Sequence, residues 1–307
     1  MATAIFHKLG RLYASANKPW ALNQGQLTAI VFVLPAFALF SIFVVLPMLE
    51  AASFSFFDWS GFGAVGEFVG LENYERMVSH KVFTTAIWNN VLIIAASIFI
   101  SLPMAFLLAV LVADKFPGVS FFRAAFFIPY ILADIAAGLI WKFLYDGEYG
   151  IVQAIAAWFG YDSVYVLADR DFAMYAVLLV VVWKYFGVHM IIYIAGLQSI
   201  SREVLEAARC DGANWWTTLT RVIIPLMGPT IRLTVFFSIL GSVQFFDLIV
   251  PLTNGGPQNS TQTLVSYLYN FGIVRLNIGF GSAVGVFLFA VCVIFAVSYR
   301  RLLMKGD

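Results

Sequence analysis

Charged residues are scarce in this chain of 307 residues. Asp, Glu, Lys and Arg together make up only 11% of it, whereas 62% of the residues are hydrophobic. An ordinary soluble domain is about 25% charged and about 45–50% apolar. Because a soluble fold of this length cannot hide so much apolar surface, the composition predicts an integral membrane protein. The net charge of +1 provides no basic face for nucleic acid and no acidic tail.

Cysteine and nucleotide-binding motifs are almost as scarce. The two cysteines, Cys210 and Cys292, are far apart and fit no metal or redox spacing, so a disulfide framework is excluded. The sequence has no zinc signature, no cofactor motif and no G-x-x-x-x-G-K-[ST] phosphate loop. We therefore expect a chain that binds no metal or cofactor and hydrolyses no ATP itself.

Long apolar runs are what the sequence does have. A membrane-spanning helix needs about 20 mainly apolar residues. Six stretches qualify, at residues 29–49, 86–112, 122–144, 174–194, 230–251 and 279–303. They predict an all-α, polytopic membrane protein with one transmembrane domain over 29–303, an N-terminal arm over 1–28 and a tail over 304–307.

The basic residues predict an orientation. Eleven of the eighteen Lys and Arg residues fall in the two terminal segments and in the connections after the second and fourth stretches. Five lie in the remaining connections, which also carry most of the acidic residues. Lys and Arg are enriched in cytoplasmic loops. The pattern therefore predicts that both termini are cytoplasmic, as in a multi-pass protein of a bacterial inner membrane.

The predicted cytoplasmic connection over 198–229 is too long for a simple turn. Ser201 can cap a helix, Glu203 follows in the first turn where the helix dipole favours an acid, and Gly212 can adopt the left-handed conformation that ends a helix. Pro225 marks the return of the chain into the fifth stretch. The connection therefore predicts a short helix lying outside the membrane.

This connection resembles the EAA loop of bacterial ABC importer permeases. Glu206-Ala207-Ala208 is followed at the family spacing by Asp211-Gly212 and then by Val222, Ile224 and Pro225, where the family has Ile, Leu and Pro. Further matches point to the carbohydrate branch, the maltose and glycerol-phosphate permease type. They are Gly70-Leu71-Glu72-Asn73-Tyr74, Ile128-Pro129-Tyr130, Trp183-Lys184, residues 195–200, and residues 252–257 after Phe246-Asp247. Ser201 stands where the family usually has Pro.

The resemblance implies a type I ABC importer permease fold in which the helix around Glu206, Ala207, Ala208, Asp211 and Gly212 couples to a separate ATPase. The implied partners are a second homologous permease, two ATP-binding subunits that hold ATP and Mg²⁺, an external solute-binding protein and a sugar-like solute. Transport would proceed by alternating access. The alternative from the residues alone is an interfacial helix with a routine glycine cap.

The solute pathway is expected on the helices before and after the EAA loop. Ser238, Ser242 and Phe245 recur at helical spacing, and a face of hydroxyls and an aromatic ring suits a sugar, although ordinary helix packing explains it too. The resemblance adds Lys184, Tyr185 and Val188, and Asp247 is either a pathway group or a loop anchor. Lys184 invites an anionic solute, but it can also pair with Asp134 across helices. On this basis Ser242→Trp is expected to block transport.

Other classes fit less well. An ABC permease for amino acids or another small solute shares the EAA loop and is the nearest alternative. An ion-coupled secondary transporter leaves that loop unexplained. An intramembrane enzyme needs a nucleophile and a base on facing helices, and His189 is the only histidine within a predicted span, with no Gly-x-Ser motif to face it.

Overall fold

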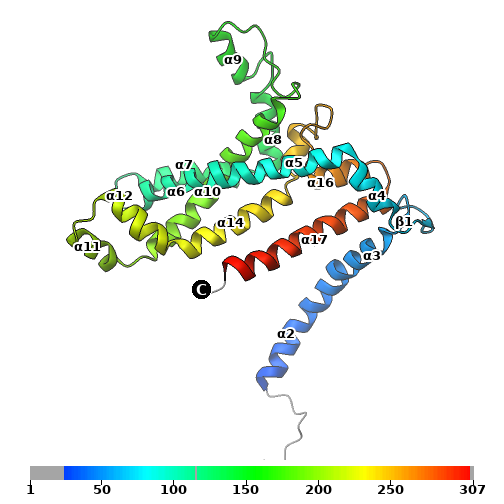
Figure 1. Cartoon of the computed structure of the whole chain (residues 1–307), viewed down its shortest axis with the longest axis horizontal. Coiled ribbons are helices and arrows are strands. Elements are labelled where there is room, and N and C mark those ends of the chain that lie inside the picture. The colour runs from blue at the N-terminus through cyan, green and yellow to red at the C-terminus, as the bar shows by residue number, and fades with distance from the viewer. Residues whose placement is uncertain (1–23, 115, 305–307) are drawn as a thin grey trace, which may run out of the picture. The chain divides into compact units, whose positions relative to one another are not determined.

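A computed structural model describes residues 24–114 and 116–304 and is drawn in Figure 1. Most of the predicted N-terminal arm, together with the last three residues of the chain, lies outside the described residues. The chain divides into two compact units after Ala51. This boundary lies near the first helix of the domain expected over 29–303, in which no side chain from Ile30 to Glu50 is buried.

The described part of the first unit is a continuous run of helix. It comprises α2 (Gln24–Phe40), the π-helical turn η1 (Ser41–Val45) and α3 (Leu46–Phe54), whose last residues belong to the second unit. Phe32 and Phe43 expose 76% and 71% of their surface, so this helix presents large apolar side chains on its outside. Such a surface is suited to lipid rather than to water.

Three of the prolines in the helical segments are preceded by wider turns. The π-helical turns η1, η2 (Ser97–Ser101) and η3 (Leu219–Ile223) each end two residues before a proline, namely Pro47, Pro103 and Pro225. A proline ring clashes with the carbonyl four residues earlier and offers no N–H. A π turn widens the backbone at that point, so the helix continues past the proline.

The second unit is built almost entirely of helices. Its elements are α4 (Glu72–Ser79), α5 (Lys81–Ala96), η2, α6 (Leu102–Ala113), α7 (Val119–Ile131), α8 (Asp134–Leu144), α9 (Ile151–Trp158), α10 (Ala173–Gln198), α11 (Arg202–Cys210), α12 (Trp215–Thr218), η3, α13 (Ile224–Leu226), α14 (Gly228–Val243), α15 (Ile249–Leu252), α16 (Leu264–Tyr267), η4 (Leu268–Ile273) and α17 (Ile278–Leu303). The strands β1 (Phe57–Asp58) and β2 (Glu67–Phe68) pair antiparallel.

Four helical segments in the described chain are long and apolar enough to cross a membrane: 30–54, 81–113, 173–198 and 278–303. The number rises to six if each of two bent helix pairs is one span. The second of the four, α5–η2–α6, begins five residues before the expected stretch at residue 86, and α10 extends four residues past residue 194.

The expected third span is not one helix. It breaks between α7 and α8, whose axes differ by 95°. Leu132 and Ala133 between them are extended. At 1.5 Å per residue, α7 is about 20 Å long and α8 about 16 Å, so neither alone crosses a hydrocarbon core of about 30 Å. Figure 1 shows α8 turning away from α7, with α9 beyond it.

The expected fifth span, residues 230–251, is also shorter in the structure. Helix α14 ends at Val243 because Asn90 on α5 occupies its last carbonyls: the Nδ2 of Asn90 donates to Ser242 O at 2.6 Å and to Val243 O at 3.2 Å. Asn90 Oδ1 also accepts from the backbone N–H of Leu264 at 2.8 Å, at the start of α16. A hydrogen bond from a distant helix thus ends α14 where hydrophobicity alone would continue it.

Helix α10 is at the centre of the second unit. It packs on α6 and α7 and also contacts α5, α8 and α14 (Figure 1). Val177 and Val180 on α10 are fully buried with Ile93 of α5 and Leu248 in one hydrophobic cluster. Half of the hydrophobic run in α10 is therefore inside the protein, which places its polar residues within a packed interior.

The segment before α5 is fixed by polar side chains. In the Gly70–Tyr74 motif, the Asn73 Nδ2 donates to Ser55 O and Phe57 O, both at 3.0 Å, and the Tyr74 hydroxyl donates to Ser55 Oγ at 2.8 Å. Asn73 is buried. The motif that marked the family resemblance therefore anchors α4 against the chain around β1.

A titratable contact joins the start of α5 to α16. His80 Nδ1 lies 2.8 Å from the Tyr267 hydroxyl, and burial, with Arg275 and Arg76 nearby, lowers the pKa of His80 below its usual 6.5. The unfolded chain then binds the proton more readily, so stability is expected to fall as the pH drops below about 6.5. The thermal midpoint should decrease between pH 7.5 and 5.5 by more in the natural protein than in His80→Gln. Equal decreases of the midpoint in the two proteins would show that protonation of His80 does not affect stability.

Candidate functional site

A cavity of about 360 Å³ lies between helices that are distant in the sequence. Its size falls within the range of small-molecule sites. Its walls come from α5 and η2, from α7, from α10, and from α14 and the turn after it. The lining residues are Ile93, Ser97, Tyr130, Val181, Tyr185, Val188, His189, Ile192, Phe237, Ser238, Gly241, Ser242 and Phe245.

The structure gathers five of the seven expected pathway residues around this cavity. They are Tyr185, Val188, Ser238, Ser242 and Phe245. Phe245 is not on the helix with the two serines, as its spacing suggested, because α14 has already ended. It is instead held by its backbone: the Thr263 hydroxyl donates to Phe245 O at 2.7 Å.

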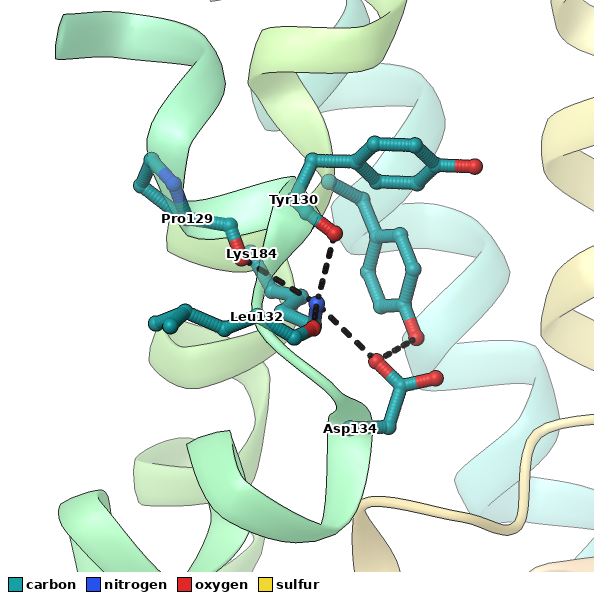
Figure 2. Close-up of polar contacts among 6 residues, drawn as sticks. Pro129, Tyr130, Leu132, Asp134 and Lys184 are labelled. Atoms are coloured by element: carbon teal, nitrogen blue, oxygen red, sulfur yellow. Dashed lines mark hydrogen bonds and ion pairs between the residues drawn. The ribbon is translucent and has the colours of Figure 1, made fainter.

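Lys184 is not among the lining residues, and its ammonium is fully engaged (Figure 2). Lys184 Nζ lies 3.2 Å from Asp134 Oδ1 and donates to Pro129 O at 3.1 Å, to Tyr130 O at 3.0 Å and to Leu132 O. The pairing with Asp134 that the sequence allowed is therefore present. We call these contacts of Lys184 the lysine clamp.

The lysine clamp explains the break between α7 and α8. The last carbonyls of a helix lack partners and carry partial negative charge, whereas the first turn favours an acid. Lys184 binds carbonyls at the end of α7, and Asp134 is the first residue of α8. Gly187 brings the two backbones together, since a Cβ there would lie 2.1 Å from Phe126 O. The clamp thus fixes the bend and with it the position of Tyr130 in the cavity wall.

Asp247 lies in an exposed turn between α14 and α15 and does not line the cavity. Whether Asp247 belongs to the pathway or anchors the loop stays a prediction. Eight lining residues were not among the expected pathway residues: Ile93, Ser97, Tyr130, Val181, His189, Ile192, Phe237 and Gly241. In the sequence, Tyr130 stands out as part of a motif and His189 as a polar residue within a predicted span, but nothing in the sequence shows that their helices converge.

Two polar atoms at the cavity are without hydrogen-bond partners among the described residues. They are Ser238 Oγ and His189 Nδ1, in side chains that are 6% and 8% exposed. Ser242 Oγ, by contrast, donates to Ser238 O at 2.8 Å and lies 3.4 Å from Ser97 Oγ. Buried polar atoms normally have partners, so these two are available to a ligand.

The predicted EAA segment forms helix α11, with no buried residue. Its end is built as expected at Gly212, whose φ is +78°. The N–H of Gly212 donates to Arg209 O, and the N–H of Ala213 donates to Ala208 O, both at 3.0 Å, which is a Schellman motif. Ser201 has the extended conformation of an N-cap, but its side chain makes no capping hydrogen bond. Glu206, Ala207 and Asp211 are exposed.

Helix α11 is connected directly to two walls of the cavity. Three residues join it to α10, and α12, η3 and α13 join it to α14. The Asn214 side chain caps α12 by accepting from the N–H of Thr217 at 2.8 Å, a cap that the sequence analysis did not identify. Helix α11 thus lies in the chain between the helices that carry Tyr185 and Ser238.

Comparison with known proteins identifies the family. The family model of the binding-protein-dependent transport system inner membrane component matches residues 86–305. The sulfoquinovosyl glycerol transport system permease protein SmoG of Agrobacterium fabrum is 31% identical over 94% of both chains. The diacetylchitobiose uptake system permease protein NgcF of Streptomyces coelicolor is 31% identical over 84% of this chain and 77% of its own.

The fold has a solved counterpart. A chain of the bacterial alginate ABC transporter, crystallised in complex with an alginate pentasaccharide-bound periplasmic protein, superposes with a TM-score of 0.81 at 21% identity, over 93% of this chain and 97% of that one. The sequence-based resemblance and the all-α fold are thus confirmed. The protein is a multi-pass membrane protein that belongs to the family of binding-protein-dependent transport system inner membrane components.

Proposed function

We propose that this chain is one of two permease subunits of an ATP-driven importer for a sugar or sugar derivative. The observation that carries the proposal is the connection between an exposed helix bearing the EAA sequence, α11, and the cavity walls α10 and α14. The exposed carboxylate of Glu206 suits a basic groove on an ATPase subunit. The names of the relatives, which concern sugar-containing solutes, support the solute class.

The mechanism follows from these connections. Closure of two ATPase subunits, which hold ATP and Mg²⁺, moves α11 of each permease. The long helices then swing, and the cavity opens toward an external solute-binding protein, as alternating access requires. The cavity supplies hydroxyls and aromatic rings, which suit the two kinds of surface that a sugar presents. The chain itself acts as a conduit and performs no chemical step.

The proposal includes an orientation. With α11 facing the ATPase, the chain lies in a bacterial inner membrane with both termini in the cytoplasm. The alternative, a permease for an amino acid or another small solute, would use the same α11. The lining of the cavity favours the sugar, because Ser238 and Ser242 lie beside the rings of Tyr185 and Phe245.

The test is purification of the tagged chain from its native membrane in a gentle detergent, followed by mass spectrometry of the proteins that accompany it. We expect an ATPase and a second permease of similar length. Uptake of a radiolabelled panel of neutral saccharides, sugar phosphates, uronates and amino acids should then depend on the chain for one or more sugars. Uptake restricted to amino acids would contradict the sugar class.

Charge reversal at Glu206 tests whether α11 binds the ATPase. Glu206→Lys should leave membrane insertion unchanged, because Glu206 is exposed on a helix whose residues are all unburied. The variant should lose the ATPase during purification, or lower solute-stimulated ATP hydrolysis at least tenfold. Glu206→Asp, which keeps the carboxylate, should retain the partner. Unchanged ATP hydrolysis in Glu206→Lys would remove the coupling role of α11.

A further inference from the structure

The charge of the cavity wall bears on which sugars can pass. Lys184, the residue that in sequence alone suggests an anionic solute, is held in the lysine clamp: Asp134 balances its charge, and three carbonyls accept hydrogen bonds from its ammonium (Figure 2). Among the described residues that line the cavity, none is Asp, Glu, Lys or Arg. The wall that this chain contributes therefore offers no cation to a phosphate, sulfonate or carboxylate.

What the wall offers instead is neutral hydrogen bonding. Ser238 Oγ and His189 Nδ1 are more than nine-tenths buried and have no partner among the described residues. A buried imidazolium without a partner costs far more than the neutral ring, so His189 presents one donor and one acceptor nitrogen. Tyr185 and Phe245 pack edge to face beside them, with ring centroids 6.0 Å apart. Sugar hydroxyl groups, which both donate and accept, satisfy such atoms without bringing a charge to a wall that offers no counterion.

We propose that this wall receives an uncharged, polyhydroxylated solute, a neutral saccharide rather than a sugar phosphate, sulfonate or uronate, with His189 and Ser238 as its hydrogen-bonding groups. This inference rests on the proposed function and narrows its substrate class. The fold by itself does not decide the point, because the structural counterpart belongs to a transporter described as importing an acidic polysaccharide.

The predicted neutrality of the cavity wall can be measured without knowing the solute. Gly241 lines the cavity, and a Cβ added there meets no atom within 4 Å, so Gly241→Cys places a thiol in open space. The two natural cysteines are first replaced by Cys210→Ser and Cys292→Ser. The complete importer in membrane vesicles is then treated with anionic 2-sulfonatoethyl methanethiosulfonate and with its cationic 2-trimethylammonioethyl analogue.

The expected result is a ratio of the two reaction rates within about threefold of the ratio for free 2-mercaptoethanol, since a neutral wall does not concentrate either ion. Adding Val188→Lys to the same chain, with Val188→Met as the matched neutral control, calibrates the assay by placing a cation at the cavity. That change should accelerate the anionic reagent. A preference of tenfold or more for either ion without Val188→Lys would overturn the proposal.

The uptake panel gives a second, independent outcome. Uptake that depends on the chain and is confined to neutral saccharides supports the inference, whereas dependent uptake of a sugar phosphate or a uronate overturns it and leaves the proposed sugar importer intact. Failure of the proposed function appears elsewhere, as the absence of an ATPase and a second permease from the purified material. The two failures are therefore distinguishable.

Discussion

Lys184→Met is expected to destabilise the protein severely and to abolish transport. The substitution removes the ammonium that pairs with Asp134 and leaves the carbonyls of Pro129 and Tyr130 without their donor. Breaking a buried ion pair by removing one partner costs about 3–5 kcal/mol, and we expect the lower figure because Asp134 is 30% exposed. At about 2 °C per kcal/mol, the thermal midpoint in detergent should fall by about 6 °C or more.

The controls separate the clamp from a general effect of losing a lysine. Lys142 is exposed on α8, close in sequence to the clamp, and Lys142→Met should leave the midpoint unchanged. Adding Asp134→Leu to Lys184→Met removes the carboxylate that has lost its partner, so the thermal midpoint should rise part of the way back. The decrease caused by the unpaired carbonyls of Pro129 and Tyr130 should remain. A midpoint for Lys184→Met within 1 °C of the natural protein would show that the clamp does not hold the bend.

Gly241→Trp is expected to block transport while the importer still assembles. Gly241 lines the cavity of about 360 Å³, and a Cβ added there meets no atom within 4 Å, so the indole would extend from an unobstructed start into the cavity. Solute uptake should fall at least twentyfold, whereas the yield of the complex with its ATPase should match that of the natural protein. Gly241→Ala is the matched control and should transport normally. Normal uptake by Gly241→Trp would remove this cavity from the pathway.

The structure changes the choice of blocking substitution. From the sequence, Ser242→Trp was the natural experiment, because Ser242 shares a helical face with Ser238. In the structure Ser242 is 5% exposed, its hydroxyl lies 3.4 Å from Ser97 Oγ, and its carbonyl accepts from Asn90. An indole there would collide with the helix α5–η2–α6 and disturb the end of α14. Loss of transport by that variant would not distinguish blockage from misfolding.

Local features were predictable from the sequence because their causes are local. The scarcity of charge and the long apolar runs identified the membrane class. The family spacing from Glu206 to Gly212 identified α11, and its end depends only on a residue that tolerates a positive φ. The serines of α14 share a face because the helix repeats every 3.6 residues. None of these conclusions requires knowledge of which helices are neighbours.

The tertiary structure alone decided what Lys184 does. Its partners are the carbonyls of a helix more than fifty residues earlier, and that helix breaks where hydrophobicity predicts a continuous span. Asn90 likewise ends α14 from a distance of about 150 residues in the chain, and Thr263 fixes Phe245. Hydrogen bonds and ion pairs between distant helices form only when packing brings the groups together. The sequence therefore identified Lys184 as a charged residue in the membrane. Only the fold showed that its ammonium binds the groups at the bend between α7 and α8 and does not line the cavity.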